Sequence, residues 1–436
     1  MFTDEPEKED PMKTPFSGCF AAAMLVCAML ALDAFGAPIE PVVALAAKEK
    51  APLLDTLREL VSIESGSGDR EGLDKIANLI AARLQTLGGT VELVEAGADA
   101  YRMFDTPAQI GKMVLARFTG TGTKKILLIA HMDTVYLRGM LAQQPFRIDG
   151  NRAYGLGISD DKHGIAVILH TIAILRQMQF RDYGELTVLI NGDEEISSPG
   201  SRALLTRLGS EADAVLSFES SPVASDRLEL VTAGIGAFIL KVEGRASHAG
   251  AAPEQGRNAL YELAHQIMQT RDLSDPATGV KMNWTIASAG TNRNVIPAQA
   301  SASADVRVMR VADYDGIEQK VRERAKNQLI PDVKVSLAFE RRRPPLEMRP
   351  PSLALAKHAQ AIYAEIGKEL AISTVTIGGG TDAAFAGLKA RGPVIERLGL
   401  RGFGSHSNDA EYIDIESIEP RLYLAARLIM DIARGK

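Results

Sequence analysis

Two histidines and three carboxylates recur where apolar segments end or begin, and these residue types can bind metal ions together. In open α/β sheets, functional sites form at the carboxyl ends of the strands. Taken singly, each of these residues could have a purely structural role, as a polar residue in a surface loop, a helix N-cap or part of a solvated acidic loop. As a set, they predict one site, made of His131, Asp160, Glu195, Glu219 and His406.

The neighbours of these residues add acid–base chemistry. Asp133 follows His131 by two positions and is close enough to hold the second ring nitrogen of that histidine. Glu194 precedes Glu195, and because adjacent side chains point in different directions, one can bind a metal while the other acts as a general base. Three consecutive acids from Asp193 repel one another unless a positive group lies among them.

The absence of sulfur from this set narrows the choice of metal. The chain has only two cysteines, Cys19 and Cys27, which excludes a disulfide-rich scaffold and a cysteine-ligated zinc module. Two metals about 3.5–4 Å apart need a shared ligand. Mixed nitrogen and oxygen ligation favours zinc, with cobalt or manganese as alternatives.

The other five of the seven histidines differ in their surroundings. His248 lies in a loop of small residues, 244–250, which other groups can approach closely, although a turn with an incidental histidine would look the same. His163 follows Lys162 at a predicted helix start, and the sequence gives it no role. Three more fall within predicted helices and are expected to be structural or surface residues: His170, His265 and His358.

The amino terminus resembles a secretory signal. The apolar run 19–32 follows Lys13 and precedes small residues, and it is shorter than the ~20 residues of a membrane span. We therefore predict a signal peptide at residues 1–37 and a periplasmic or secreted protein. Residues 3–10 are acidic, which fits a signal only if translation starts at Met12; an uncleaved anchor is the alternative.

Length and charge limit the remaining classes. The 436 residues predict two to three domains. With 49 basic and 55 acidic residues, the net charge of −6 argues against a nucleic-acid-binding or basic membrane-surface protein. No later segment is apolar for long enough to cross a bilayer.

Alternating elements predict an α/β fold, with a mixed or parallel sheet covered by helices on both faces. Within it, residues 232–341 follow the order β-α-β-β-α-β, which is ferredoxin-like. We expect this α+β domain to be inserted between 38–231 and 342–436 of the main domain. The predicted helices are 51–62, 71–88, 164–178, one that begins near Gly200, 258–270, 314–326, 353–366 and one near 418–433. The predicted strands are 113–118, 125–130, 186–190, 214–218, 237–243, 282–288, 300–309 and 334–339.

Together, these residues and the stretches around them resemble those of a known family. From about residue 40 to Lys436 it is similar to the di-zinc metallopeptidases and aminoacylases, and most similar to their bacterial glutamate carboxypeptidases of the carboxypeptidase G type. Any one shared stretch could arise by chance, but all of them in this order could not. They are AHMDTV, YGLGISDDK, DEE, SFES, GRASHAGAAPE, NWTIASAG, NVIPA, ADVR, GGGTDAA and GFGSHSNDAEY.

The resemblance implies a role for each residue of the site. Asp160 would bridge two zinc ions, with His131 and Glu219 completing one site, and Glu195 and His406 the other. Glu194 would be the general base that activates a metal-bridged hydroxide, and Asp133 would orient His131. The Asp160–Asp161 peptide bond would be cis. The inserted domain would be a lid and dimerisation domain, and its His248 would stabilise the oxyanion in the partner subunit of a homodimer.

The resemblance also implies a substrate. Residues that match the glutamate-binding positions are Arg227, Asn294, Arg307 and Arg343. Arg227 stands where the related enzymes have lysine, and His163 where the family usually has glycine. We therefore expect hydrolysis of the bond to a C-terminal glutamate in folates, folate analogues and N-acyl-glutamates, without nucleic-acid or membrane partners. The alternative within the family is an aminoacylase or dipeptidase that acts on a different acyl-amino acid. A non-catalytic relative should lack a metal ligand or the general base, and this chain has all of them.

Overall fold

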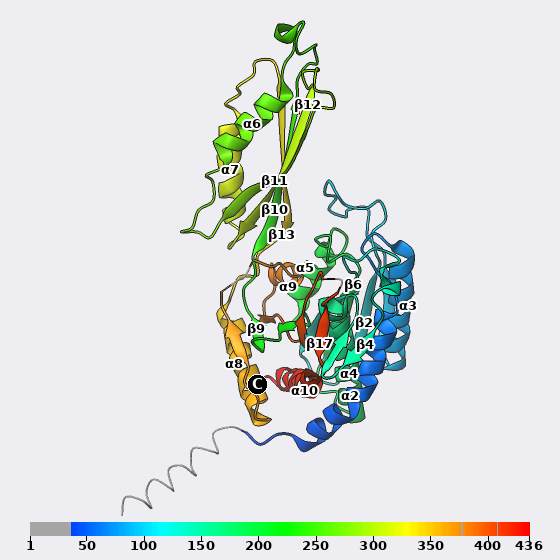
Figure 1. Ribbon diagram of the computed structural model, residues 1–436. Coiled ribbons are helices and arrows are strands. Elements are labelled where there is room, and N and C mark those ends of the chain that lie inside the picture. The colour runs from blue at the N-terminus through cyan, green and yellow to red at the C-terminus, as the bar shows by residue number, and fades with distance from the viewer. Residues whose placement is uncertain (1–35, 376–377, 408) are drawn as a thin grey trace, which may run out of the picture.

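The chain folds into a main α/β domain and a smaller α+β domain that projects from it (Figure 1). The computed structural model describes residues 36–436 except 376, 377 and 408. Its α-helices are α2 (Glu40–Val61), α3 (Arg70–Thr86), α4 (His163–Gln177), α5 (Arg202–Glu211), α6 (Ala259–Thr270), α7 (Asp313–Ala325), α8 (Pro350–Glu365), α9 (Ala383–Gly387) and α10 (Ile418–Ala433).

The main domain is built on a six-stranded mixed sheet in the order β1-β2-β6-β3-β7-β15. Neighbours β6, β3, β7 and β15 run parallel, whereas β1 and β2 add an antiparallel edge. This confirms the predicted mixed sheet. The strands are β1 (Thr90–Val94), β2 (Met113–Thr119), β3 (Lys125–His131), β6 (Glu185–Asn191), β7 (Ala214–Ser217) and β15 (Val394–Ile395).

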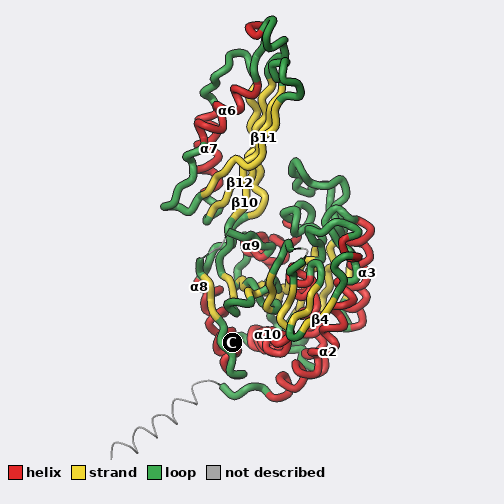
Figure 2. Tube along the Cα trace, viewed as in Figure 1, coloured by secondary structure: helices red, strands yellow, loops and turns green. Residues whose placement is uncertain are grey.

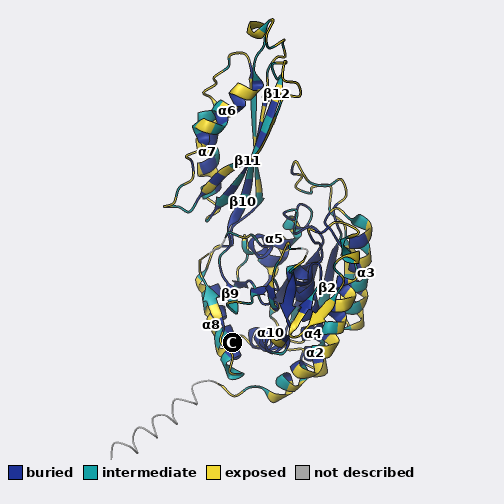
Figure 3. Cartoon of the chain, viewed as in Figure 1, coloured by how far each residue is buried: buried dark blue, intermediate teal, exposed yellow. Residues whose placement is uncertain are grey.

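Helices cover both faces of this sheet because its central strands are apolar on both sides. Ile126 and Leu128 of β3 pack into the core beneath α2, α3, α4 and α10. The alternate residues, Leu127 and Ile129, pack against α5 and α9 on the other face. Figure 3 shows the result, with buried strands inside helices whose outer faces are exposed.

Short strands form two further sheets in the main domain. One has five strands in the order β4-β5-β17-β16-β8, and the other pairs β14 with β9. These strands are too short for a periodic pattern, and the sequence did not predict them. They are β4 (Arg147–Asp149), β5 (Arg152–Tyr154), β8 (Ser221–Pro222), β9 (Arg227–Glu229), β14 (Ala371–Ser373), β16 (Arg401–Phe403) and β17 (Tyr412–Asp414).

The smaller domain is an antiparallel sheet with two helices on one face (Figure 2). Its order along the chain is β10, α6, β11, β12, α7, β13, and the sheet order is β11-β12-β10-β13, as expected of a ferredoxin-like unit. Alternate residues of β10 (Phe238, Leu240 and Val242) pack beneath α7 and α6. The strands are β10 (Gly234–Glu243), β11 (Lys281–Ala289), β12 (Gln299–Val308) and β13 (Lys334–Arg343).

The first helix differs from its prediction. The apolar spacing predicted a helix over residues 51–62. In the structure α2 already begins at Glu40, with Pro41 in its first turn and Pro52 inside the helix. Of the predicted signal peptide, residues 1–35 lie outside the described residues. Within the described part of the chain, no helix is both long and apolar enough to cross a membrane.

Candidate metal centre

The predicted ligands meet at the carboxyl ends of the parallel strands. His131 is the last residue of β3, and Glu219 follows the end of β7, its parallel neighbour, by two residues. Glu195 follows β6, on the other side of β3. Asp160 lies in a distorted turn, Ile158–Lys162, directly before α4, and its peptide bond to Asp161 is cis, as the resemblance implied. His406 comes from the loop between β16 and β17.

These five side chains form two groups that share Asp160. Oδ1 of Asp160 lies 3.0 Å from Nε2 of His131, which is also 3.2 Å from Oε1 of Glu219. Oδ2 of Asp160 lies 3.3 Å from Nε2 of His406, which is 3.1 Å from Oε2 of Glu195. The two oxygens of one carboxylate thus face two separate sets, each with one imidazole nitrogen and one further carboxylate.

The charges in this arrangement favour a bound cation. Hydrogen bonds to Asp160 and Glu195 raise the pKa of His406 to about 11. Burial disfavours a charged His131, but Glu219, Asp133 and Asp160 outweigh it and raise its pKa well above the ordinary value. Burial raises the pKa of Glu195 to about 8. These raised pKa values mean that the crowded carboxylates favour protons on His131, His406 and Glu195. Divalent cations would replace those protons.

Three observations test whether the residues fit a metal pair. All donors are imidazole nitrogens or carboxylate oxygens, which suit zinc. Each group keeps its donor atoms within 4.8 Å of one another. Oε1 of Glu195 is buried and has no hydrogen-bond partner among the described residues. The set fits two cations, with His131, Asp160 and Glu219 on one, and Asp160, Glu195 and His406 on the other.

Asp133 contacts both His131 and the loop that follows β6. Its backbone carbonyl lies 3.0 Å from Nδ1 of His131, and its carboxylate lies 3.4 Å from the same atom. The carboxylate also accepts the backbone N–H groups of Glu194 and Glu195, both at 3.0 Å, and the hydroxyl of Ser67 at 2.7 Å. Asp133 is completely buried, so it ties the loop after β6 to the end of β3.

Glu194 belongs to this loop and contacts Arg343. The guanidinium of Arg343 donates to Oε1 and to the backbone carbonyl of Glu194. Arg343 is 4% exposed, and its next carboxylate partner, Asp382, is 4.0 Å away. Burial raises the pKa of Glu194 above the usual range for a glutamate, although Arg343 acts against this. A raised pKa suits a group that accepts a proton near neutral pH.

The predicted substrate-binding residues lie in three places. Arg307 and Arg343 flank Ile235 on opposite sides of β10, at the end of the inserted domain that joins the main domain. Arg307 donates to Asp305 at 2.9 Å and to the carbonyl of Gly378 at 2.9 Å. Arg227, in β9, lies 3.8 Å from Glu229. The structure brings only Arg343 into contact with the predicted catalytic residues.

His248 and Asn294 lie together at the opposite end of the inserted domain. His248 forms a β-bridge with Val295, and the carbonyl of Asn294 accepts the N–H of Ala249 at 2.9 Å. The ten residues of β10 span about 30 Å between this end and the junction with the main domain. Within one chain, His248 is therefore remote from the metal-ligand groups.

The four remaining histidines have structural surroundings. His170 lies 2.6 Å from Glu49, His265 lies 3.0 Å from the carbonyl of Asn327, and His358 lies 2.9 Å from Asp431. His163 is completely buried, and burial lowers its pKa to about 3, so it is a neutral interior residue. A Cβ atom at position 399 would lie 2.3 Å from Nε2 of His163, so only Gly399 leaves room for this ring.

Some residues around the site were not singled out in the sequence. Ser67 donates to Asp133, Asp382 accepts the side-chain amide of Asn191 at 2.7 Å, and Glu411 contacts the turn that carries Asp160. Asp382 and Glu411 lie within the stretches GGGTDAA and GFGSHSNDAEY that carry the family resemblance. Their place in these stretches is the one feature of the sequence that could have identified Asp382 and Glu411. No feature of the sequence identifies Ser67.

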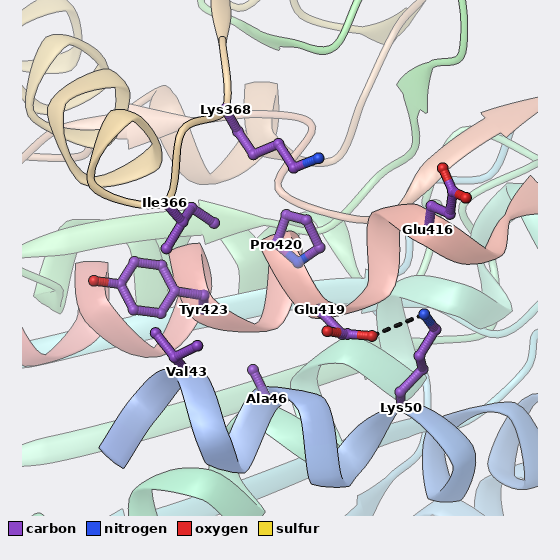
Figure 4. Close-up of a pocket in the computed structure, with 9 residues that line it drawn as sticks. All are labelled: Val43, Ala46, Lys50, Ile366, Lys368, Glu416, Glu419, Pro420 and Tyr423. Carbon is purple, nitrogen blue, oxygen red and sulfur yellow. Dashed lines mark hydrogen bonds and ion pairs between the residues drawn. The ribbon is translucent and has the colours of Figure 1, made fainter. Parts of the chain in front are cut away.

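Two hollows differ in their relation to the site. One of about 670 Å³ opens beside Glu195 and is lined by Ser67, Arg138 and Ile196, among others. Another, of about 330 Å³, lies between α2, α10 and the turn after α8 (Figure 4). An ion pair of 2.8 Å between Lys50 and Glu419 crosses its edge. None of the predicted site residues lines this second hollow, so it has no part in the site.

Sequence comparisons find related proteins. A family model described as Peptidase family M20/M25/M40 matches residues 127–431. Carboxypeptidase G2 of Pseudomonas sp. (strain RS-16) is 44% identical over 95% of this chain and 98% of its own. A succinyl-diaminopimelate desuccinylase of Delftia acidovorans is 26% identical over 87% of this chain and 98% of its own.

Solved structures show the same fold. The aminopeptidase PepT from Bacillus cereus superposes with a TM-score of 0.69, covering 88% of this chain and 99% of that chain. Its sequence identity is 20%, so this likeness concerns the fold alone. The predicted fold class, a mixed α/β domain with an inserted α+β domain, is confirmed.

Proposed function

Because this chain belongs to peptidase family M20/M25/M40, it is a hydrolase, and we propose that it is a zinc carboxypeptidase that releases C-terminal glutamate. Its substrates would be folates, folate analogues and N-acyl-glutamates. One observation carries the proposal: Asp160 presents its two oxygens to two separate ligand groups. The 44% identity to carboxypeptidase G2 supports the substrate class.

The chemistry of the site follows from its residues. When bound, two zinc ions would polarise the scissile carbonyl and lower the pKa of a water molecule at the site. Glu194 accepts a proton from this water and delivers it to the leaving amine. Arg343 contacts Oε1 of Glu194, and this proton transfer needs only the other oxygen. Asp133 holds His131 and the backbone of Glu194 in place.

His248 completes the proposed site from a second subunit. Its Nδ1 accepts the N–H groups of Gly250 at 3.1 Å and Ala251 at 3.0 Å, so the neutral ring carries its proton on Nε2. An exposed Nε2–H is a suitable donor to the oxyanion of a tetrahedral intermediate. Because His248 is remote from the ligands of its own chain, the donor must come from the partner in a homodimer.

The inserted domain has a surface that fits such a dimer. β11 is an edge strand of its sheet, and an open edge is a template for pairing with another strand. Ile286 on β11 is 64% exposed, and α6, which packs near this edge, exposes Leu260, Tyr261 and Met268. We assign residues 232–341 as the lid and dimerisation domain, and 38–231 with 342–436 as the catalytic domain. Export by the signal peptide 1–37 would place the dimer in the periplasm or outside the cell.

Substrate recognition has one competing possibility. Arg343 is engaged by Glu194, and Arg307 already pairs with Asp305 at 2.9 Å, whereas Arg227 lies 3.8 Å from Glu229. Because two of the three expected arginines are already paired within the chain, the second candidate is a substrate with a single carboxylate, as in an aminoacylase or dipeptidase. The 26% identity to a succinyl-diaminopimelate desuccinylase is in line with hydrolysis of an acyl-amino acid other than an acyl-glutamate.

One assay separates the two. The purified protein is incubated with folate or methotrexate, with and without a chelator, alongside N-acetyl-arginine and N-acetyl-methionine. The proposal predicts release of glutamate that the chelator abolishes. Cleavage of folate that is insensitive to the chelator would contradict the metal mechanism. Inactivity toward folate with rapid cleavage of another acyl-amino acid would establish the second candidate.

A further inference from the structure

One loop of the chain supplies both a histidine that is a proposed metal ligand and a buried carboxylate. The loop between β16 and β17 carries His406, and five residues later Glu411 precedes β17. Glu411 is 3% exposed and makes no contact that the proposed reaction uses. A buried carboxylate is retained only where it accepts enough hydrogen bonds, so its partners indicate its role.

The partners of Glu411 converge on the turn that presents Asp160. Oε1 accepts the backbone N–H of Ser159 at 2.8 Å and that of Asp160 at 3.1 Å. Oε2 accepts the backbone N–H of Gly157 at 3.0 Å and the hydroxyl of Tyr136. Four donors thus point at one carboxylate, and three of them belong to residues 157–160.

The turn needs such an acceptor because its backbone is irregular. Asp160 has φ −146° and ψ 88°, and Asp161 has φ −130° and ψ 33°, both outside the helical region. Backbone N–H groups in such a segment cannot all find regular helical acceptors, and leaving them unpaired in the interior is costly. Glu411 accepts three of them at once, which fixes the direction of the Asp160 side chain.

We propose that Glu411 is a positioning residue that holds Asp160 so that its two oxygens face His131 and His406. This inference rests on the proposed metal site. Partners that orient a ligand typically change metal affinity or activity by about 10–100-fold when they are removed. Because Glu411 acts on the shared ligand, its loss should weaken both cation sites.

Glu411→Gln is the direct test. A glutamine has one acceptor oxygen and one NH₂ group, so in either orientation at least one backbone N–H of residues 157–160 faces another donor. We expect zinc affinity, measured by competition with a chromophoric chelator, to fall about 10–100-fold. The kcat for folate should fall with it, while KM changes less than about threefold, because Glu411 does not contact the substrate.

Glu262→Gln is a matched control in the inserted domain. Glu262 is fully buried and accepts the backbone N–H groups of Leu329 at 2.8 Å and Ile330 at 2.7 Å, and the side-chain amide of Gln266 at 2.7 Å. The same substitution there should lower the Tm without changing zinc affinity. Equal losses of zinc affinity in both variants would overturn the positioning role, because the effect would then be general destabilisation.

A milder variant keeps the proposal testable if Glu411→Gln does not fold. Tyr136→Phe removes one of the four donors and leaves the three backbone donors in place, and it should weaken zinc binding to a smaller extent. Unchanged zinc affinity in the folded variants would refute the role of Glu411. If the wild-type protein itself bound no zinc, the proposed function would fail first, which the wild-type titration shows separately.

Discussion

Replacement of Glu194 separates its proposed role as a base from its role as the partner of Arg343. Glu194→Gln keeps an oxygen that can accept from the guanidinium, but it cannot take up a proton. General acid–base catalysis is worth about 10²–10⁴-fold, and Glu194 would act in two steps, so kcat should fall about 10³–10⁴-fold. That corresponds to about 4–5.5 kcal/mol of activation free energy.

Glu194→Ala adds a cost in stability. It leaves Arg343, 4% exposed, with only Asp382 at 4.0 Å among its carboxylate partners. Removing one partner of a buried ion pair costs about 3–5 kcal/mol. We therefore expect both variants to retain their metal content and to lose turnover, while only the alanine variant shows a large drop in the free energy of unfolding.

The assay combines folate cleavage, metal analysis and urea unfolding. Glu365→Gln is the control, because Glu365 pairs with the largely buried Arg427 at 3.2 Å, in α8 and α10, and it has no role in the proposed reaction. It should remain active. Substantial activity in Glu194→Gln with its metals bound would refute the assignment of the base.

Three further predictions concern specificity, assembly and pH. Arg307→Ala should raise KM for folate about tenfold or more with little change in kcat, measured by initial rates, because it removes a charged hydrogen bond to a carboxylate. Ile286→Asp should convert the dimer to monomers in size-exclusion chromatography, and both Ile286→Asp and His248→Ala should lower kcat. An active monomer would contradict the shared site. Burial lowers the pKa of His170 although Glu49 opposes it. The folded state therefore binds fewer protons than the unfolded state, and stability present above the unfolded pKa of about 6.5 is lost as the pH falls below it. Urea unfolding at pH 7.5 and 5.5 should show a smaller loss in His170→Gln than in the wild type.

The main sheet and the inserted domain could be predicted because their strands carry strong apolar patterns. The run 126–130 is apolar throughout, and the structure shows it between two helical layers. The strands β4, β5, β8, β16 and β17 have two or three residues, and no pattern of that length is distinctive. Their sheet is held by pairing between distant segments, such as Tyr412 with Tyr154, which a local pattern does not contain.

The ligand set could be predicted from its place at strand ends, but the supporting contacts could not. His131 and Glu219 follow neighbouring apolar strands, so their proximity follows from the sheet. The contact of Arg343 with Glu194 joins residues 149 positions apart, and it depends on where the inserted domain returns to the main domain. Glu411 likewise reaches residues 251–254 positions away. Such contacts are set by tertiary packing and leave no local signal.

The central claim is that two cations share Asp160, and zinc titration of the metal-free protein tests it most directly. Bound zinc is measured at equilibrium for the wild type and for Asp160→Asn. The account predicts two zinc ions per chain in the wild type and greatly weakened binding at both sites in the variant, because Asp160 belongs to both groups. A wild-type stoichiometry of one or none, or two ions bound with unchanged affinity in Asp160→Asn, would contradict it.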